Sequence, residues 1–293
     1  MRILFVGTVL FSQEMLSHLL TMNVQIVGVC TAKTSAQNAD YADLQPVCDR
    51  HGIELHPTAD INCAATIDWI AERNPDIIFC FGWSRLLGKS LITLAPLGLV
   101  GYHPAALPSN RGRHPIIWAL ALGLKKTAST FFMMDDRADS GDILSQVDVD
   151  ISEYDDASSL YQKIISSARG QLDLLVPSLM NGSETRIKQD DDKANYWRKR
   201  SAVDGQIDWR MPATGICNLV RALSHPYPGA HMLTSNGVVK VWKASLVQDV
   251  LPNAEPGKII AIEGGQAIVR CGINAVRLIE TDPELHPALG TYL

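Results

Sequence analysis

The sequence predicts an α/β protein: a Rossmann-like, doubly wound parallel sheet followed by a small C-terminal OB-like β-barrel domain. Three observations predict it: compact apolar runs without polar alternation, apolar residues at helical spacing between them, and a change to short β segments after residue 207. Strands without alternation are buried on both faces, which is typical of parallel sheets covered by helices. With 293 residues and 46% hydrophobic content, the chain can bury a sizeable core.

The expected elements of the first half alternate between strand and helix. Strands are expected at residues 2–6, 24–30, 53–56, 76–81 and 98–103. Helices are expected at residues 11–20, 44–51, 67–73 and 90–95. Gly52 occupies the C′ position at which many helices end, and Pro96 stops the helix before it. Ligands bind beyond the carboxyl ends of the strands in such sheets, so the candidate site comprises the loops at residues 7–11, 82–88 and 104–115.

The second half predicts a long helix and then a separate β domain. A strand is expected at residues 145–151, an amphipathic helix at 158–180, a polar linker at 189–200 and a helix at 213–222. Short β segments follow at residues 230–233, 238–244, 257–262, 267–271 and 275–279, which indicates a small antiparallel barrel. We therefore expect a catalytic domain at residues 1–189, a linker at 190–204 and an OB-like domain at 205–293. Few basic and aromatic residues in the barrel favour a structural or substrate-fencing role.

Composition and motifs exclude several classes of protein. The six cysteines are scattered without a C-x-x-C pair, which argues against a zinc site and a disulfide framework. Residues 7–12 lack the G-x-G-x-x-G pattern, so NAD or FAD binding is not expected. Because no run of about 18 apolar residues is present, we expect no membrane span and a cytoplasmic protein. A net charge of -5 gives no general attraction to phosphate backbones.

A histidine and a carboxylate can meet at the end of the fifth expected strand. His103 ends the apolar run at residues 98–103, and Asp139 lies in an acidic turn after a Pro/Gly/Arg loop and a helix. Histidine suits proton transfer near neutral pH, and a carboxylate partner orients its ring and favours its protonated form. Prolines and glycines in the loop indicate a rigid segment shaped around a ligand. The alternative is a structural histidine with satisfied hydrogen bonds.

The same residues carry a resemblance to a known family. His-Pro-Ala-Ala-Leu-Pro at residues 103–108, Arg-Gly-Arg at 111–113 and Asp-Ser-Gly-Asp-Ile at 139–143 resemble the formyltransferases that use 10-formyltetrahydrofolate. Similar segments extend over nearly the whole chain, at residues 5–8, 75–78, 197–200, 208–209 and 226–230. Within this family, of which methionyl-tRNA formyltransferase is a member, the chain looks most like the sugar-nucleotide N-formyltransferases. One of these is the domain that acts on UDP-4-amino-4-deoxy-L-arabinose.

This resemblance implies a reaction and a set of site residues. An amine would attack the formyl carbonyl of 10-formyltetrahydrofolate, with His103 as general base or oxyanion stabiliser and Asp139 as its orienting partner. No metal is implied. The crevice for the folate would be lined by Phe81, Gly82, Trp83, Leu86, Leu87, Asp136 and Ala138. The substrate would meet Thr8, Phe11, Arg111, Arg113 and His114.

The chain departs from the family pattern at two positions. Gly101 stands where the family has an asparagine whose amide donates to the developing oxyanion, and Ala105 replaces the serine of the loop. Loss of such a donor typically costs about a hundred- to a thousandfold in rate. Asn110 is our candidate replacement, and a water molecule in the space beside the glycine is the alternative. Tyr102 should point to the opposite face of its strand, so it is a poor substitute.

The identity of the amine depends on the basic residues near the site. The tRNA-acting relative carries a basic insertion after its second strand. In this chain, residues 31–47 contain Lys33 as their only basic residue, together with two aspartates. This favours a small nucleotide-sugar substrate over a nucleic acid. The sequence is compatible with a homodimer. Arg111, Arg113 and His114 suit a diphosphate, although the arginines could instead clamp the loop. The remaining hypotheses are methionyl-tRNA formylation and a weakly active or inactive folate or nucleotide-sugar binding protein.

Overall fold

The computed structural model describes residues 1–32, 39–235, 237–248 and 253–293. Lys33 lies outside these residues. Contacts divide the described chain into two compact units, each treated by itself below. The first comprises Met1–Pro115, Thr127–Val149 and Gln162–Trp197, and the second comprises Ile116–Lys126, Asp150–Tyr161 and Arg198–Leu293. Residues 190–197, the first part of the expected linker, are therefore grouped with the first unit.

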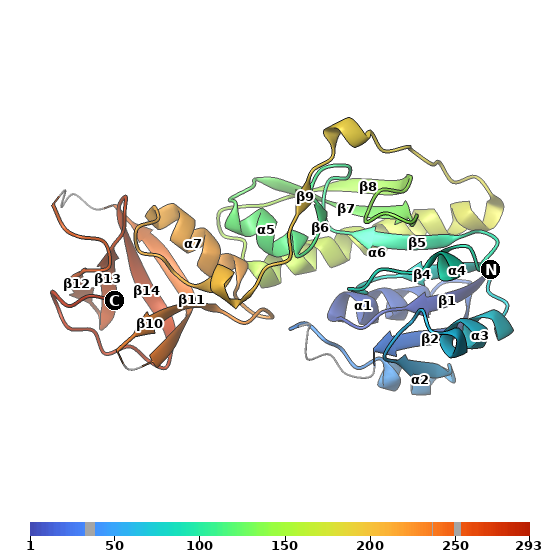
Figure 1. Cartoon of the computed structure of the whole chain (residues 1–293), viewed down its shortest axis with the longest axis horizontal. Helices are drawn as coiled ribbons and strands as arrows, with labels where there is room; N and C mark the ends of the chain where they lie inside the picture. Colours follow the sequence, from blue (N-terminus) through green and yellow to red (C-terminus); the bar gives the residue numbers. More distant parts are fainter. Residues whose placement is uncertain (33–38, 236, 249–252) are drawn as a thin grey trace. The chain divides into compact units, whose positions relative to one another are not determined.

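A mixed sheet forms the centre of the first unit. Over the described residues it has seven strands, in the order β3-β2-β1-β4-β5-β7-β8 (Figure 1). They are β1 (Arg2–Val6), β2 (Gln25–Ala32), β3 (Leu55–Thr58), β4 (Ile77–Cys80), β5 (Leu99–His103), β7 (Lys126–Met133) and β8 (Ile143–Asp150). Strands β1 to β5 pair in parallel with one another, and the strand order reverses at β1. The predicted α/β fold class is confirmed.

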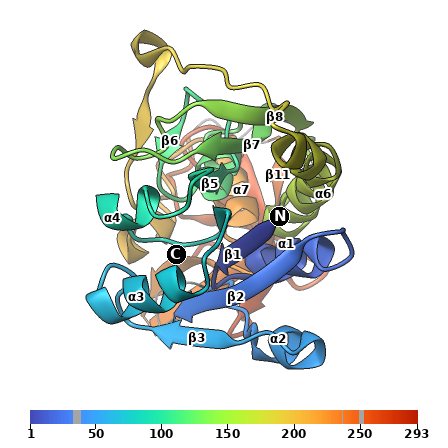
Figure 2. The same cartoon turned by 90° about the vertical axis from the view of Figure 1, so that its right-hand side faces the viewer.

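Helices cover both faces of this sheet. They are α1 (Leu10–Leu19), α2 (Gln45–His51), α3 (Ala64–Glu72), α4 (Lys89–Ile92) and α6 (Ala157–Asn181). Ile70 of α3 and Leu91 of α4 share one buried cluster with Val6 of β1 and Cys80 of β4. Helices α1 and α6 lie on the other side of the sheet (Figure 2). Gly52 follows α2 in the left-handed conformation, with φ of 64°, as its predicted C′ position requires.

Strand β7 was not predicted, and it makes the sheet mixed instead of parallel. It pairs antiparallel with β5, with Val100 opposite Met133 and His103 opposite Thr130. The chain enters β7 at the end of the sheet where β5 finishes, so β7 can only run back in the opposite direction. The strand is buried along most of its length, which explains why its sequence lacks the polar alternation of an exposed strand.

The second unit contains the predicted antiparallel β structure. Its strands are β10 (Ala230–Thr234), β11 (Gly237–Val247), β12 (Ile259–Glu263), β13 (Gln266–Arg270) and β14 (Ala275–Asp282). They form one sheet in the order β10-β11-β14-β13-β12, with every described pair antiparallel. Helix α7 (Ala213–Ala222) packs on β11 and β14 (Figure 1). In the described stretches of both units, no helix has the length and hydropathy needed to cross a membrane.

Candidate functional site

The candidate site is built around His103, the last residue of β5. The side chain is buried, with 5% of the residue exposed. Its Nε2 atom lies 2.8 Å from the backbone carbonyl oxygen of Asn110, and its Nδ1 atom lies 3.6 Å from Oδ2 of Asp139. A carbonyl oxygen only accepts hydrogen bonds, so Nε2 carries a proton in this arrangement. The Nδ1 contact is too long for a hydrogen bond but brings the carboxylate beside the ring.

Asp139 is held in a constrained turn. Its φ is 55°, in the left-handed region that few residues other than glycine adopt. The carboxylate accepts a hydrogen bond of 2.8 Å from the backbone N–H of Gly112, and the backbone carbonyl accepts one of 2.9 Å from Nε2 of Gln189. Nearby, a Cβ atom on Gly141 would lie 1.7 Å from the carbonyl oxygen of Met133, so only glycine fits there. The turn therefore brings Asp139 to His103, as the sequence predicted.

Asn110 contributes its backbone and its side chain in different ways. Its carbonyl holds His103, while its N–H donates to Oδ1 of Asn195 at 2.7 Å. The Oδ1 atom of Asn110 accepts from Nδ2 of Asn195 at 3.2 Å. Within the described chain, the contact with Asn195 thus uses the oxygen of the Asn110 amide and leaves its NH₂ group as a donor for a ligand. The amide remains our candidate for the role of the missing family asparagine.

The space beside Gly101 is filled by neighbouring side chains. A Cβ atom at this position would lie 2.7 Å from Cγ of Met134 and 2.9 Å from Cζ of Phe132. Gly101 pairs with Cys80 of β4, so it faces the same side of the sheet as the cluster beneath α3 and α4. A water molecule in place of the family amide therefore does not fit there without movement of Met134. Ala105 is fully buried, and its backbone carbonyl accepts a hydrogen bond of 2.7 Å from Oγ1 of Thr130.

Arg111 is buried, and its guanidinium connects the loop at residues 104–115 to residues 189–196. With 1% of the residue exposed, its guanidinium donates to Oε1 of Gln189 at 2.8 Å, to Oδ1 of Asp191 at 2.9 Å and to Oη of Tyr196 at 3.0 Å. Hydrogen bonds from Arg137 and from Arg111 hold the pKa of the Asp191 carboxyl below its ordinary value. These contacts support the clamp interpretation of Arg111 over direct diphosphate binding.

The other two predicted diphosphate ligands lie at the end of the same loop. Arg113 is half-buried, and its guanidinium donates to the backbone carbonyl of Ser84 at 2.5 Å. This bond joins the loop at residues 104–115 to the loop at residues 82–88, two of the three loops expected to form the site. His114 is half-buried and has a φ of 56°.

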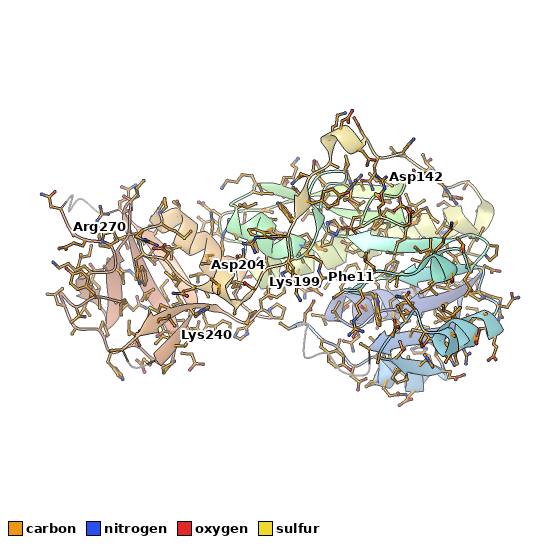
Figure 3. The ribbon with its side chains drawn as sticks, viewed as in Figure 1. Phe11, Asp142, Lys199, Asp204, Lys240 and Arg270 are labelled. Atoms are coloured by element: carbon orange, nitrogen blue, oxygen red, sulfur yellow. The ribbon has the colours of Figure 1, made fainter. Side chains whose placement is uncertain are left out.

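Two predicted substrate residues are buried instead of lining an open loop. Thr8 is 2% exposed and Phe11 is 5% exposed. The ring of Phe11, at the start of α1 (Figure 3), stacks on Tyr102 with 4.1 Å between centroids. Tyr102 points away from the His103 face, as predicted, and bonds Oγ of Ser129 at 2.7 Å. The structure therefore does not bring Phe11 together with His103.

The predicted folate residues fall into three groups. The Phe81 ring belongs to the aromatic cluster under α1, and Gly82 has φ of 74° with a Cβ position only 2.3 Å from Val9. Trp83 and Leu87 pack against the cluster under α3 and α4. Leu86 is 72% exposed, Asp136 is exposed and Ala138 is half-buried. The buried Nε1 of Trp83 has no hydrogen-bond partner among the described residues.

Sequence reasoning missed the residues that hold the two loops together. They lie at residues 189–197, here called the returning segment, which the sequence presented as a polar linker. Gln189 contacts the Asp139 turn and Asn195 contacts Asn110. No motif marks either residue; the aromatic pair Tyr196 and Trp197, which forms β9, is the only apolar signal in an otherwise polar stretch. Among the described residues, no group of three His, Cys, Asp or Glu side chains could hold a metal ion.

Comparisons with known proteins point to one family. The family model for formyl transferase matches residues 1–172, and the model for the formyl transferase C-terminal domain matches residues 199–290. The N-formyltransferase of Helicobacter canadensis, solved with folinic acid and dTDP-3-aminofucose, matches with TM-score 0.73 and 15% identity over 94% of this chain and 98% of that chain.

Two further solved structures share the fold. WlaRD, a sugar 3N-formyl transferase solved with dTDP and 5-N-formyl-THF, matches with TM-score 0.70 and 16% identity over 94% of this chain and 96% of that chain. A sugar N-formyltransferase from a Shewanella species matches with TM-score 0.66 and 18% identity over 82% of this chain and 96% of that chain.

Proposed function

Because the chain belongs to the formyl transferase family, we propose that it moves a formyl group from 10-formyltetrahydrofolate to the amino group of a nucleotide-linked amino sugar. One observation carries the proposal: the buried His103 lies with Nδ1 3.6 Å from Asp139 at the carboxyl end of β5. Ligands of doubly wound sheets bind at this end. The solved structures with folate compounds and dTDP or a dTDP-linked amino sugar support the choice of both substrates.

The proposed chemistry begins with attack of the amine on the formyl carbon. A C–N bond forms to the sugar nitrogen, the bond from the formyl carbon to N10 of the folate breaks, and one proton passes from the amine to N10. With Nε2–H donating to the Asn110 carbonyl, the Nδ1 atom of His103 is the one that takes up this proton. The Asp139 carboxylate beside Nδ1 stabilises the imidazolium that forms.

The developing oxyanion needs a donor, and Gly101 provides no side chain. We assign this role to the NH₂ group of Asn110, because its oxygen is already bonded to Asn195. Asn110→Asp tests the assignment, since aspartate keeps the oxygen but replaces the NH₂ donor. We expect turnover to fall about a hundredfold, the cost of removing one oxyanion donor. Unchanged turnover would exclude the Asn110 side chain as the donor.

The acceptor is tested by measuring release of tetrahydrofolate. The protein is incubated with 10-formyltetrahydrofolate and, in separate reactions, with UDP- or dTDP-linked 3-amino and 4-amino sugars or with methionyl-tRNA. We expect release with at least one amino sugar and none with the charged tRNA. Release with the tRNA alone would overturn the sugar proposal in favour of tRNA formylation. Folate binding without release in any reaction would instead identify a binding protein.

A further inference from the structure

We propose that Gln189 and Asn195 are positioning residues for formyl transfer, which fix His103 and Asp139 relative to each other through the returning segment. The inference rests on the roles of His103 and Asp139 in the proposed function. His103 ends β5 and is bonded to the loop at Asn110, whereas Asp139 lies in a later turn. The returning segment contacts both this loop and this turn. The stretch that the sequence presented as a linker is thus part of the site.

Asn195 holds the loop that fixes the histidine ring. Its amide forms two hydrogen bonds to Asn110, at 2.7 Å to the backbone N–H and at 3.2 Å to the side-chain oxygen. Its own carbonyl accepts the N–H of Arg111 at 3.0 Å. The peptide on either side of the Asn110 carbonyl is therefore anchored, and this carbonyl is the acceptor for Nε2 of His103. Asn195 acts on the ring through one intervening residue.

Gln189 holds the turn that carries the carboxylate. Its NH₂ group donates to the carbonyl of Asp139 at 2.9 Å and to the carbonyl of Gly141 at 2.7 Å. Its Oε1 atom accepts from the guanidinium of Arg111 at 2.8 Å, and the residue is 6% exposed. One buried amide therefore joins the Asp139 turn to the loop that follows Asn110. Both donors and the acceptor of the amide are used.

A backbone ladder completes the connection. Strand β6 (Arg111–Gly112) pairs in parallel with β9 (Tyr196–Trp197), and the Arg113 N–H donates to the Trp197 carbonyl at 3.0 Å. A Cβ atom on Gly112 would lie 2.3 Å from that same carbonyl oxygen, so the approach requires glycine. The N–H of Gly112 is then left to donate to the Asp139 carboxylate. The loop is thereby fixed to the returning segment on one side and to Asp139 on the other.

Asn195→Ala tests the proposal with little risk to folding, because Asn195 is exposed. Without the Asn195 amide, the N–H and the side chain of Asn110 lose their partner, so the Asn110 carbonyl fixes the ring less firmly. We expect kcat to fall about ten- to a hundredfold, as for displacements of about 1 Å, while KM for the folate and for the amino sugar stays within about twofold. Asn181→Ala, at the exposed end of α6, is the matched control and should leave kcat, KM and the melting temperature unchanged.

A second readout does not depend on turnover. The Nε2 proton of His103, buried and bonded to a carbonyl, should give a slowly exchanging imidazole signal in the NMR spectrum that His103→Asn removes. We expect Asn195→Ala to broaden or lose this signal and Asn181→Ala to keep it. Asn195→Asp retains an oxygen for the Asn110 N–H and should fall between the wild type and the alanine variant in both measurements. Wild-type kcat and an intact signal in Asn195→Ala would overturn the proposal.

Gln189→Glu tests the other half of the connection. Glutamate keeps the oxygen that Arg111 contacts but removes the NH₂ group that holds the Asp139 turn, so we expect a larger fall in kcat than for Asn195→Ala. A fall in melting temperature with no change in kcat would mean that Gln189 is only structural. His103→Asn, assayed in parallel, separates the two levels of inference. Turnover by His103→Asn would refute the site itself. If His103→Asn is inactive while Asn195→Ala is fully active, only the positioning role is refuted.

Discussion

The two faces of strand β5 show how differently one short strand can be used. On one face, Tyr102 packs in an aromatic cluster with Phe11, Phe81 and Phe131. On the other face, Gly101 lies against Met134, and the His103 ring has the Asn110 carbonyl and the Asp139 carboxylate as polar partners. The Tyr102 face is fixed by packing of aromatic side chains from α1, from β7 and from the residue after β4, whereas the His103 ring is oriented by a hydrogen bond to the Asn110 carbonyl and by the Asp139 carboxylate beside it. Substitutions on the two faces should therefore fail in different ways.

His103→Asn should give the largest effect, and on activity alone. Removal of the general base typically costs about a hundred- to ten-thousandfold, so we expect turnover to disappear from a standard assay. Folate affinity should stay within a few fold, because the ring acts on the reacting carbon. Single-turnover kinetics and equilibrium folate binding measure the two quantities separately. Retained turnover would show that the site has been assigned wrongly.

Phe11→Ala should give the largest effect on stability. Removal of a buried phenylalanine ring costs about 3–5 kcal/mol in the free energy of unfolding, which urea denaturation measures. The stacking partner Tyr102 faces away from His103, so kcat of the folded fraction should change little. If Phe11 instead binds the substrate, as the sequence suggested, KM for the amino sugar should rise with little loss of stability. The two outcomes distinguish a core residue from a substrate ligand.

Gly101→Asn should give an intermediate loss of stability. The new side chain must displace Met134 and Phe132, and overpacking of this kind costs about 1–3 kcal/mol in the free energy of unfolding. Met134→Ala removes the side chain that fills this space. Gly101→Asn should therefore cost much less free energy of unfolding when it is added to Met134→Ala than when it is added to the wild type. Denaturation of the four proteins gives the coupling between the two positions. Additive costs would mean that Met134 does not limit the space beside Gly101.

Tyr102→Phe should give the smallest effect and a characteristic pH dependence. Loss of the bond to Ser129 should cost about 1 kcal/mol near neutral pH. Burial raises the pKa of the Tyr102 hydroxyl above its unfolded value, so the folded protein keeps the proton longer. The stability that this provides is complete below pH of about 10 and is lost as pH rises further. Denaturation at pH 8 and at pH 10.5 measures how far the free energy of unfolding falls between the two pH values. This fall should be smaller for Tyr102→Phe than for the wild type.

Much of the fold could be predicted because it follows from periodicity and local rules. The buried strands, the Gly52 helix end and the small β unit are marked by residues close together in the sequence. His103 and Asp139 could be found because one ends an apolar run and the other lies in a motif with a family resemblance. Strand β7 was missed because its direction depends on where the chain enters the sheet, which no local pattern records.

The supporting residues of the site left no such signal. Gln189 reaches a carbonyl 50 positions earlier, and Asn195 reaches Asn110 across 85 positions. Each forms hydrogen bonds to backbone groups, which are the same whatever residue carries them. The filling of the space beside Gly101 by Met134 depends likewise on which volumes meet in three dimensions. Only the folded chain reveals contacts of this kind.

The position of the returning segment has a consequence for any exchange of domains between related proteins. The segment lies beyond residues 1–172, which match the formyl transferase model, and before residues 199–290, which match the C-terminal model. A fragment cut at residue 172 would keep His103 and Asp139 but lose the partners of the buried Arg111. Insertions or deletions between Gln189 and Asn195 would shift β9 against β6. A hybrid protein should therefore be joined after Trp197, because the length of this stretch is set by the site.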